Sequence, residues 1–211
     1  MIKKLLVFGA SIVYGSWDEK GGWAGHLRRY LDRQMNVAEF DSQHLFNLGV
    51  SGATTKDLLN RIEVEASARF KPDRTNIIIS VGTNDSIWLK KENRNMVSAS
   101  EYINNLKELV SIAKKYSDKL VFIGSIPVDE SRVTPLFFDE NIYLYNKYVE
   151  QYDRITKDFC EKENIPFLNL FDGFIKEKYQ DFLIDGLHPN TKGHKKMFKL
   201  IKQFLIENKV I

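Results

Sequence analysis

The chain has 211 residues, of which 43% are hydrophobic and 28% are charged, and its formal net charge is +3. This length and composition are those of one ordinary globular unit, so we expect a single domain over residues 1–211. The 31 basic and 28 acidic residues are mixed along the sequence. Such a mixture does not form the basic face of a nucleic-acid-binding protein, and we expect no nucleic-acid partner.

The apolar run near the N-terminus is short. It extends only from Leu5 to Phe8, whereas a signal peptide carries roughly 7–15 apolar residues. No stretch reaches the roughly 18 apolar residues of a membrane span. We therefore expect a cytoplasmic protein with no stable membrane insertion; the sequence leaves its oligomeric state open.

Short apolar segments alternate with longer amphipathic segments along the chain. Apolar periodicity predicts the following elements in chain order: strand Ile2–Phe8, helix Trp23–Met35, strand Leu45–Leu48, helix Thr55–Ala68, strand Asn76–Val81, helix Ser98–Tyr116, strand Leu120–Ile123, helix Asn141–Asn164, strand Pro166–Leu168 and helix Thr191–Asn208. Segment Pro127–Asp139 has no clear period and is expected to be a loop. The alternation predicts an α/β fold whose parallel sheet is covered on both faces.

Polar and glycine-rich segments follow the predicted strands. Ligands of open parallel sheets bind at the carboxyl ends of the strands. Four such segments are Gly9-Ala10-Ser11, Gly49-Val50-Ser51-Gly52, Gly82-Thr83-Asn84-Asp85 and Ser125-Ile126-Pro127, and a fifth segment, Asp185–Asn190, precedes the last helix. We therefore consider these five segments together as one candidate site.

Three residues of these segments have the chemistry of a serine hydrolase. The hydroxyl of Ser11 is a weak nucleophile unless a base takes its proton, and His188 is the candidate base. Asp185 lies three residues before His188, close enough for a turn to bring its carboxylate to the imidazole and fix the tautomer. We predict that Ser11, Asp185 and His188 form a catalytic triad.

Acyl transfer also needs hydrogen-bond donors aimed at the developing oxyanion. The candidates are the backbone N–H groups of Ser11 and Gly52 and the side-chain amide of Asn84. A glycine lets the backbone approach a substrate closely, and an asparagine amide donates without competing as a base. We predict an oxyanion hole formed by Ser11, Gly52 and Asn84.

Four blocks of the sequence resemble those of the SGNH hydrolase superfamily, also called GDSL esterases and lipases. They occur in the family's order and cover nearly the whole chain: Val7–Ser11, Asn47–Gly52, Val81–Asp85, and Asp185–Asn190 followed by Gly193. The resemblance implies a flavodoxin-like three-layer α/β/α sandwich with a five-stranded parallel sheet. It also implies the same triad and oxyanion donors as above. The family usually has an aspartate before the nucleophile, where this chain has Ala10; that aspartate is not a triad member.

The expected function is therefore hydrolysis of a small carboxylic ester, short-chain or acetyl, through an acyl-enzyme on Ser11. The ester could belong to an acylated sugar, a lipid or a short-chain alcohol. The same triad would also serve an acyltransferase, in which a sugar or alcohol replaces water. No cofactor is expected. No metal is expected either, since the spacing of His26, His44, His188 and His194 matches no zinc pattern.

Two other classes of protein are weighed against this expectation. Tyr143-x-x-x-Lys147 has the spacing of short-chain dehydrogenases, but Val13 replaces a glycine needed for phosphate binding, and the pair is more simply explained as neighbours on a helix. A non-catalytic binding module would have no reason to keep all five site residues. Trp17 and Trp88 follow two of the blocks, and one of them is expected to line an acyl or alcohol pocket unless both are core residues.

Overall fold

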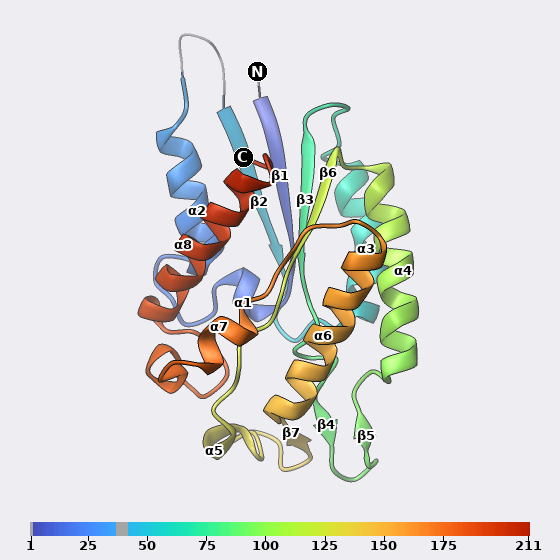
Figure 1. Ribbon diagram of the computed structural model, residues 1–211, viewed down its shortest axis with the longest axis vertical. Coiled ribbons are helices and arrows are strands. Elements are labelled where there is room, and N and C mark those ends of the chain that lie inside the picture. Colours follow the sequence, from blue (N-terminus) through green and yellow to red (C-terminus); the bar gives the residue numbers. More distant parts are fainter. Residues whose placement is uncertain (1, 37–41) are drawn as a thin grey trace.

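The computed structural model describes residues 2–36 and 42–211, and its centre is a five-stranded sheet (Figure 1). The strands are β1 (Ile2–Gly9), β2 (Ser42–Gly49), β3 (Thr75–Ser80), β6 (Lys119–Ile123) and β8 (Phe167–Leu168), in the spatial order β2-β1-β3-β6-β8. All four neighbouring pairs are parallel. The predicted parallel α/β fold is therefore confirmed. Each predicted strand coincides with one of these five, although the predictions at β3 and β8 each extend one residue beyond the strand, at Val81 and at Pro166.

Helices cover both faces of this sheet (Figure 1). The described residues form α1 (Ser11–Tyr14), α2 (Gly22–Arg33), α3 (Thr55–Ser67), α4 (Ala99–Lys115), α5 (Glu130–Val133), α6 (Asn146–Lys162), α7 (Phe171–Ile175), α8 (Thr191–Glu207) and a 3-10 helix at Tyr179–Phe182. The predicted helices at α2, α3, α4 and α8 agree with the structure to within two residues at each end. Side chains explain where three of these helices begin, since Thr54, Ser98 and Asn190 each accept a hydrogen bond from the first turn of α3, α4 or α8.

The core has two halves because neighbouring side chains of a strand point to opposite faces. Leu6 and Phe8 of β1 pack with residues of α3, α4 and α6. Leu5 and Val7 of the same strand pack with residues of α2, α7 and α8. The chain thus forms three layers, and the carboxyl ends of its strands open toward the loops at the lower end of Figure 1.

A second, antiparallel sheet lies beyond the end of β3 and was not predicted. It consists of β4 (Trp88–Leu89), β5 (Arg94–Asn95) and β7 (Ile142–Tyr143), in the order β5-β4-β7. The expectation that the helix begins at Asn141 is therefore wrong: Ile142 and Tyr143 pair with β4, and α6 begins only at Asn146. Helical periodicity alone could not detect this pairing, because the partner strand lies some fifty residues away in the sequence.

The predicted loop Pro127–Asp139 contains the short helix α5. Asp129 begins this helix, and its side chain accepts a hydrogen bond from the backbone N–H of Ser131. Four residues make a single turn, too short to give a periodic signal. Among the described residues, no helix combines the length and the apolar character needed to cross a bilayer.

Candidate active site

Ser11 is the first residue of α1, immediately after the turn that ends β1. The N–H groups of the first turn of a helix have no partner within that helix, so the backbone N–H of Ser11 is available as a donor. The other end of α1 is fixed by Asn47 of β2, whose Nδ2 donates to the carbonyl oxygens of Val13 (2.8 Å) and Tyr14 (3.3 Å). Asn47 belongs to the second sequence block, but its residue type alone gave no sign of this positioning role.

The loop from Ile184 to Asn190 brings His188 to Ser11 from the far end of the chain. Gly186 has φ +94, and a Cβ there would lie 2.7 Å from Cβ of Arg132, so only glycine fits this turn. The guanidinium of Arg132 donates to the carbonyl of Ile184 at 2.6 Å. The backbone N–H of Asp129 donates to the carbonyl of Gly186 at 2.8 Å. The residues around α5 therefore hold the loop that carries His188.

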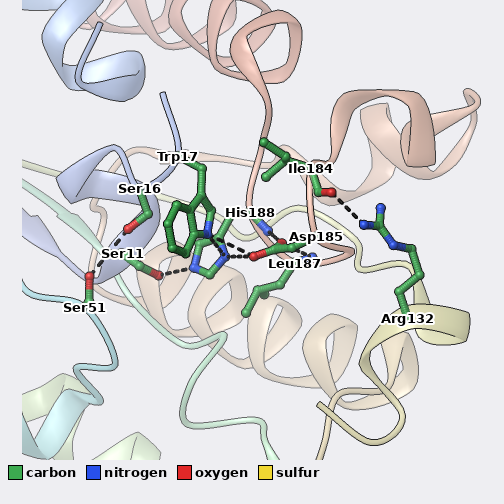
Figure 2. A network of polar contacts seen from close by, with 9 residues as sticks. All are labelled: Ser11, Ser16, Trp17, Ser51, Arg132, Ile184, Asp185, Leu187 and His188. Carbon is green, nitrogen blue, oxygen red and sulfur yellow. Dashed lines mark hydrogen bonds and ion pairs between the residues drawn. The ribbon is translucent and has the colours of Figure 1, made fainter. Parts of the chain in front are cut away.

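The structure brings the three predicted triad residues into one hydrogen-bonded chain (Figure 2). Nε2 of His188 lies 2.9 Å from Oγ of Ser11, and Nδ1 lies 2.6 Å from Oδ2 of Asp185. The other oxygen of Asp185 accepts from the backbone N–H groups of Leu187 (2.9 Å) and His188 (2.7 Å). A carboxylate only accepts, so Nδ1 carries the hydrogen and Nε2 presents its lone pair to the serine hydroxyl.

Asp185 is held in its charged form by these hydrogen bonds. Burial opposes ionisation of its carboxyl group, but the hydrogen bonds from the ring and backbone of His188 and from the backbone of Leu187 outweigh it. Together they hold the pKa of Asp185 well below its ordinary value. The carboxylate is therefore negative over the whole pH range in which an imidazole gains or loses a proton, and it favours the imidazolium.

A small pocket lies beside Ser11 at the ends of β1, β3 and β6. Its volume is about 30 Å³, enough for about two water-sized groups. Apolar side chains and hydroxyls share its wall, among them Val81, Thr83, Ser125, Ile126, Leu187 and Met197. Asn84, the predicted oxyanion donor, lines the same pocket and is 9% exposed.

Gly52, the other predicted donor, is not among the residues that line this pocket. It has φ +80, and the space that a Cβ would occupy there is open to at least 4 Å. Its neighbour Ala53 connects it to the site, because the carbonyl of Ala53 accepts a hydrogen bond from Nδ2 of Asn84 at 2.9 Å. Asn84 thus uses one amide hydrogen to hold the Gly52 loop and retains the second for a ligand.

Two buried carboxyl groups support the loops around the pocket, and sequence reasoning assigned a role to neither. Asp85 accepts from the backbone N–H (2.9 Å) and hydroxyl (2.5 Å) of Thr55 at the start of α3. Asp153 of α6 accepts from the backbone N–H of Ser125 at 2.6 Å. Burial raises the pKa of Asp85 to about 6 and that of Asp153 to about 7. Asp153 thus holds the backbone of Ser125, which lines the pocket, while Asp85 holds the start of α3.

The tryptophans that follow the sequence blocks are placed differently from what was expected. Neither Trp17 nor Trp88 is among the residues that line the pocket beside Ser11. Trp88 stacks on Tyr148 with ring centres 5.2 Å apart. Trp17 is 65% exposed, and its indole nitrogen lies 3.0 Å from Oδ2 of Asp185 (Figure 2).

The dehydrogenase-like spacing of Tyr143 and Lys147 does not place them on one helix. Tyr143 lies in β7 and Lys147 in α6, so the explanation of this pair as helix neighbours is wrong. The ammonium of Lys147 packs over the rings of Tyr145 and Tyr148 instead. The spacing of Tyr143 and Lys147 therefore does not correspond to the catalytic arrangement of a dehydrogenase.

Comparison with known proteins assigns the chain to a family. The model of the GDSL-like lipase/acylhydrolase family matches residues 7–196. The isoamyl acetate-hydrolyzing esterase 1 homolog of Homo sapiens is 29% identical over 98% of this chain and 82% of its own length. The isoamyl acetate-hydrolyzing esterase of Saccharomyces cerevisiae is 28% identical over 96% of this chain and 87% of its own length.

Solved structures share the fold. A lipase/acylhydrolase from Enterococcus faecalis superposes with a TM-score of 0.75 at 22% identity, covering 96% of this chain and 95% of its own. The acetyl xylan esterase Axe2 from Geobacillus stearothermophilus (W215I variant) gives 0.73 at 22% identity, covering 96% of this chain and 94% of its own. The family match extends over most of the chain, from the segment of Ser11 to that of His188. The chain therefore belongs to the GDSL-like lipase/acylhydrolase family of SGNH hydrolases and is a carboxylic ester hydrolase.

Proposed function

We propose that this enzyme hydrolyses esters of short carboxylic acids, acetate above all, through an acyl-enzyme on Ser11. The observation that carries the proposal is the continuous chain of hydrogen bonds from Ser11 through His188 to Asp185. A serine hydroxyl whose proton faces the lone pair of an oriented imidazole is an activated nucleophile. The substrate is a small ester molecule.

The reaction has two halves that use the same imidazole. Nε2 of His188 takes the proton of Ser11 as Oγ forms a bond to the carbonyl carbon of the ester. The tetrahedral intermediate collapses when the carbon–oxygen bond to the alcohol breaks, and His188 returns its proton to the departing alkoxide. Water then attacks the acyl-enzyme, gives a proton to His188 and releases the acid, and the proton returns to Oγ. Asp185 stabilises the imidazolium in both halves.

The oxyanion of each tetrahedral intermediate would be stabilised by neutral donors. The backbone N–H of Ser11 and the second amide hydrogen of Asn84 belong to residues that line the same pocket. The backbone N–H of Gly52 is the third donor in this proposal, and Ala53 connects its loop to Asn84. These donors are fixed before the substrate arrives, so they need no reorganisation as negative charge develops.

The size of the pocket limits the acyl group. A volume of about 30 Å³ beside Ser11 has room for a methyl or an ethyl group, which favours a short acyl chain. The names of the two relatives, isoamyl acetate-hydrolyzing esterases, and of the acetyl xylan esterase all refer to acetyl esters. Three solved structures of that acetylxylan esterase are described as catalytic mutants, in which a histidine, a serine and an aspartate are replaced by alanine.

A series of esters with one leaving group tests the reaction and the acyl length together. We expect kcat/KM for p-nitrophenyl acetate to exceed that for the octanoate by at least about 100-fold, because each methylene that finds no room costs about 1–3 kcal/mol. A second series, acetates of different alcohols, serves as the control for the leaving group. Equal rates for acetate and octanoate would contradict the short acyl pocket.

The same assay separates hydrolysis from acyl transfer. With an alcohol or sugar added as acceptor, a hydrolase releases one equivalent of acid per equivalent of p-nitrophenol, measured by titration. Formation of a new ester in place of the acid would identify the acyltransferase that the same triad could serve.

Replacement of Asn84 by alanine tests the oxyanion hole. We expect kcat to fall by about 100- to 1,000-fold with a smaller change in KM, because the lost donor acts on the transition state. Asn95→Ala is the matched control, since Nδ2 of Asn95 also donates to a backbone carbonyl, that of Ser86 at 2.9 Å. A comparable loss in both variants would show that Asn84 only supports its loop.

A further inference from the structure

We propose that Trp17 is a positioning residue for the catalytic pair Asp185–His188, which it controls through the indole N–H. This inference rests on the proposed function and adds a fourth side chain to the site. Nε1 of Trp17 lies 3.0 Å from Oδ2 of Asp185 and 3.2 Å from Nδ1 of His188 (Figure 2). The sequence analysis considered Trp17 only as a pocket residue or a core residue, and not as a partner of the catalytic pair.

The chemistry of the two acceptors decides where the indole hydrogen goes. Nδ1 of His188 already donates its hydrogen to Asp185 at 2.6 Å, so it has no lone pair to offer. The indole N–H is therefore directed to Oδ2 of Asp185. The two oxygens of this carboxylate then accept four hydrogen bonds: from the backbone of Leu187 and of His188, from the imidazole and from Trp17.

This fourth hydrogen bond has two consequences. It helps to hold the plane of the carboxylate, because Oδ2 then accepts from two side chains while Oδ1 accepts from two backbone N–H groups. It also partly neutralises the negative charge on Oδ2, the oxygen that stabilises the imidazolium of His188. Without the indole, Asp185 would be freer to rotate, and the charge of Oδ2 would act more strongly on the imidazolium.

The backbone at Trp17 is strained in a way that packing does not explain. Its φ is +64, in the left-handed region that a bulky side chain rarely adopts. The side chain is 65% exposed, so little apolar burial compensates for this conformation. Strained residues of this kind concentrate at functional sites, where the neighbouring structure enforces them. The strain therefore supports a function for this indole at the position it occupies.

The surrounding loop is fastened to α8, which follows the His188 segment. Asp18 accepts from the hydroxyl of Thr191 at 2.8 Å and from the backbone N–H of Gly22 at 3.0 Å. Nδ1 of His194, a completely buried side chain of α8, accepts from the backbone N–H of Trp23 at 3.2 Å. These contacts fix the chain on the C-terminal side of Trp17, and the backbone N–H of Ser16, which donates to the carbonyl of Ser11 at 3.0 Å, fixes the other side.

Other titratable and charged groups lie near this segment, but none of them would explain a changed pH profile of the pair Asp185–His188 in a Trp17 variant. Burial lowers the pKa of His194 to about 4 and also lowers the pKa of His26. Burial opposes ionisation of Asp18, yet its hydrogen bonds from Thr191 and Gly22 leave its pKa lowered. Arg132, on the other side of the His188 loop, donates to the carbonyl of Ile184. All four groups remain in place when only the indole is changed.

Trp17→Phe removes the N–H and keeps an aromatic ring. We expect kcat for p-nitrophenyl acetate to fall by about tenfold, the effect of losing one hydrogen bond to a charged group. We also expect the acid limb of the kcat/KM profile, which reports the free enzyme's base, to move to higher pH by about half a unit. Trp88→Phe, at the tryptophan that stacks on Tyr148, is the matched control and should leave the limb in place.

Trp17→Gly separates catalysis from stability. Glycine adopts φ +64 without strain, so we expect the thermal midpoint to stay the same or rise while kcat falls and the acid limb shifts as in Trp17→Phe. If the acid limb of Trp17→Phe and Trp17→Gly lay at the same pH as that of the parent enzyme, the proposal would be overturned, whatever the value of kcat. Turnover retained by Ser11→Ala would instead refute the proposed function, so the two failures are distinguishable.

Discussion

Replacement of Ser11 by alanine is expected to lower kcat for p-nitrophenyl acetate by about 10⁶-fold, the largest effect of any single substitution in this chain. The variant loses the atom that forms the acyl-enzyme. Its neighbours should stay in place, because α1 is held by Asn47 and not by the serine hydroxyl. What remains is the contribution of the oxyanion donors to attack by water.

Steady-state release of p-nitrophenol measures this effect, and mass spectrometry of the acylated enzyme locates the acyl group. Ser16→Ala is the matched control, since its hydroxyl makes only a 3.5 Å contact with Ser51 in the same region (Figure 2). Unchanged turnover in Ser11→Ala, or an acyl group on another residue, would contradict the assignment of the nucleophile.

Asp185→Asn is expected to lower kcat by about 10⁴-fold while leaving the fold intact. The asparagine oxygen can take the place of Oδ1 and accept from the backbone N–H groups of Leu187 and His188. Its NH₂ group then faces Nδ1 of His188. Two donors cannot share one hydrogen bond, so the imidazole moves its hydrogen to Nε2 and can no longer take the proton of Ser11.

The pH profile and the stability of Asp185→Asn distinguish this tautomer effect from simple damage. The thermal midpoint should stay close to that of the parent, and Asp158→Asn, at an exposed position of α6, should leave kcat unchanged. A loss of less than about tenfold would show that the imidazole is oriented by other groups and not by Asp185.

The sequence by itself determined the layers of the fold and pointed to the residues proposed for the site. Each strand of the large sheet contains an apolar run whose end is marked by turn residues. Three long helices begin at side chains that cap them, namely Thr54, Ser98 and Asn190. Local signals of this kind do not depend on distant partners. Ser11, Asp185 and His188 were named because each lies in a segment with the right neighbours, and the structure brings these three side chains into contact.

Only the tertiary structure decided the features that depend on contacts between distant segments. Ile142 and Tyr143 form a strand because Trp88 and Leu89 offer them hydrogen bonds, and no local pattern carries that information. The buried carboxyl of Asp153 supports the backbone of Ser125 from another helix. The sequence alone allowed Trp17 to be either a core residue or a pocket residue. Its contact with Asp185, 168 residues later, exists because Asp18 and His194 fasten its loop to α8, and such a long-range contact is set by the fold and not by residue type.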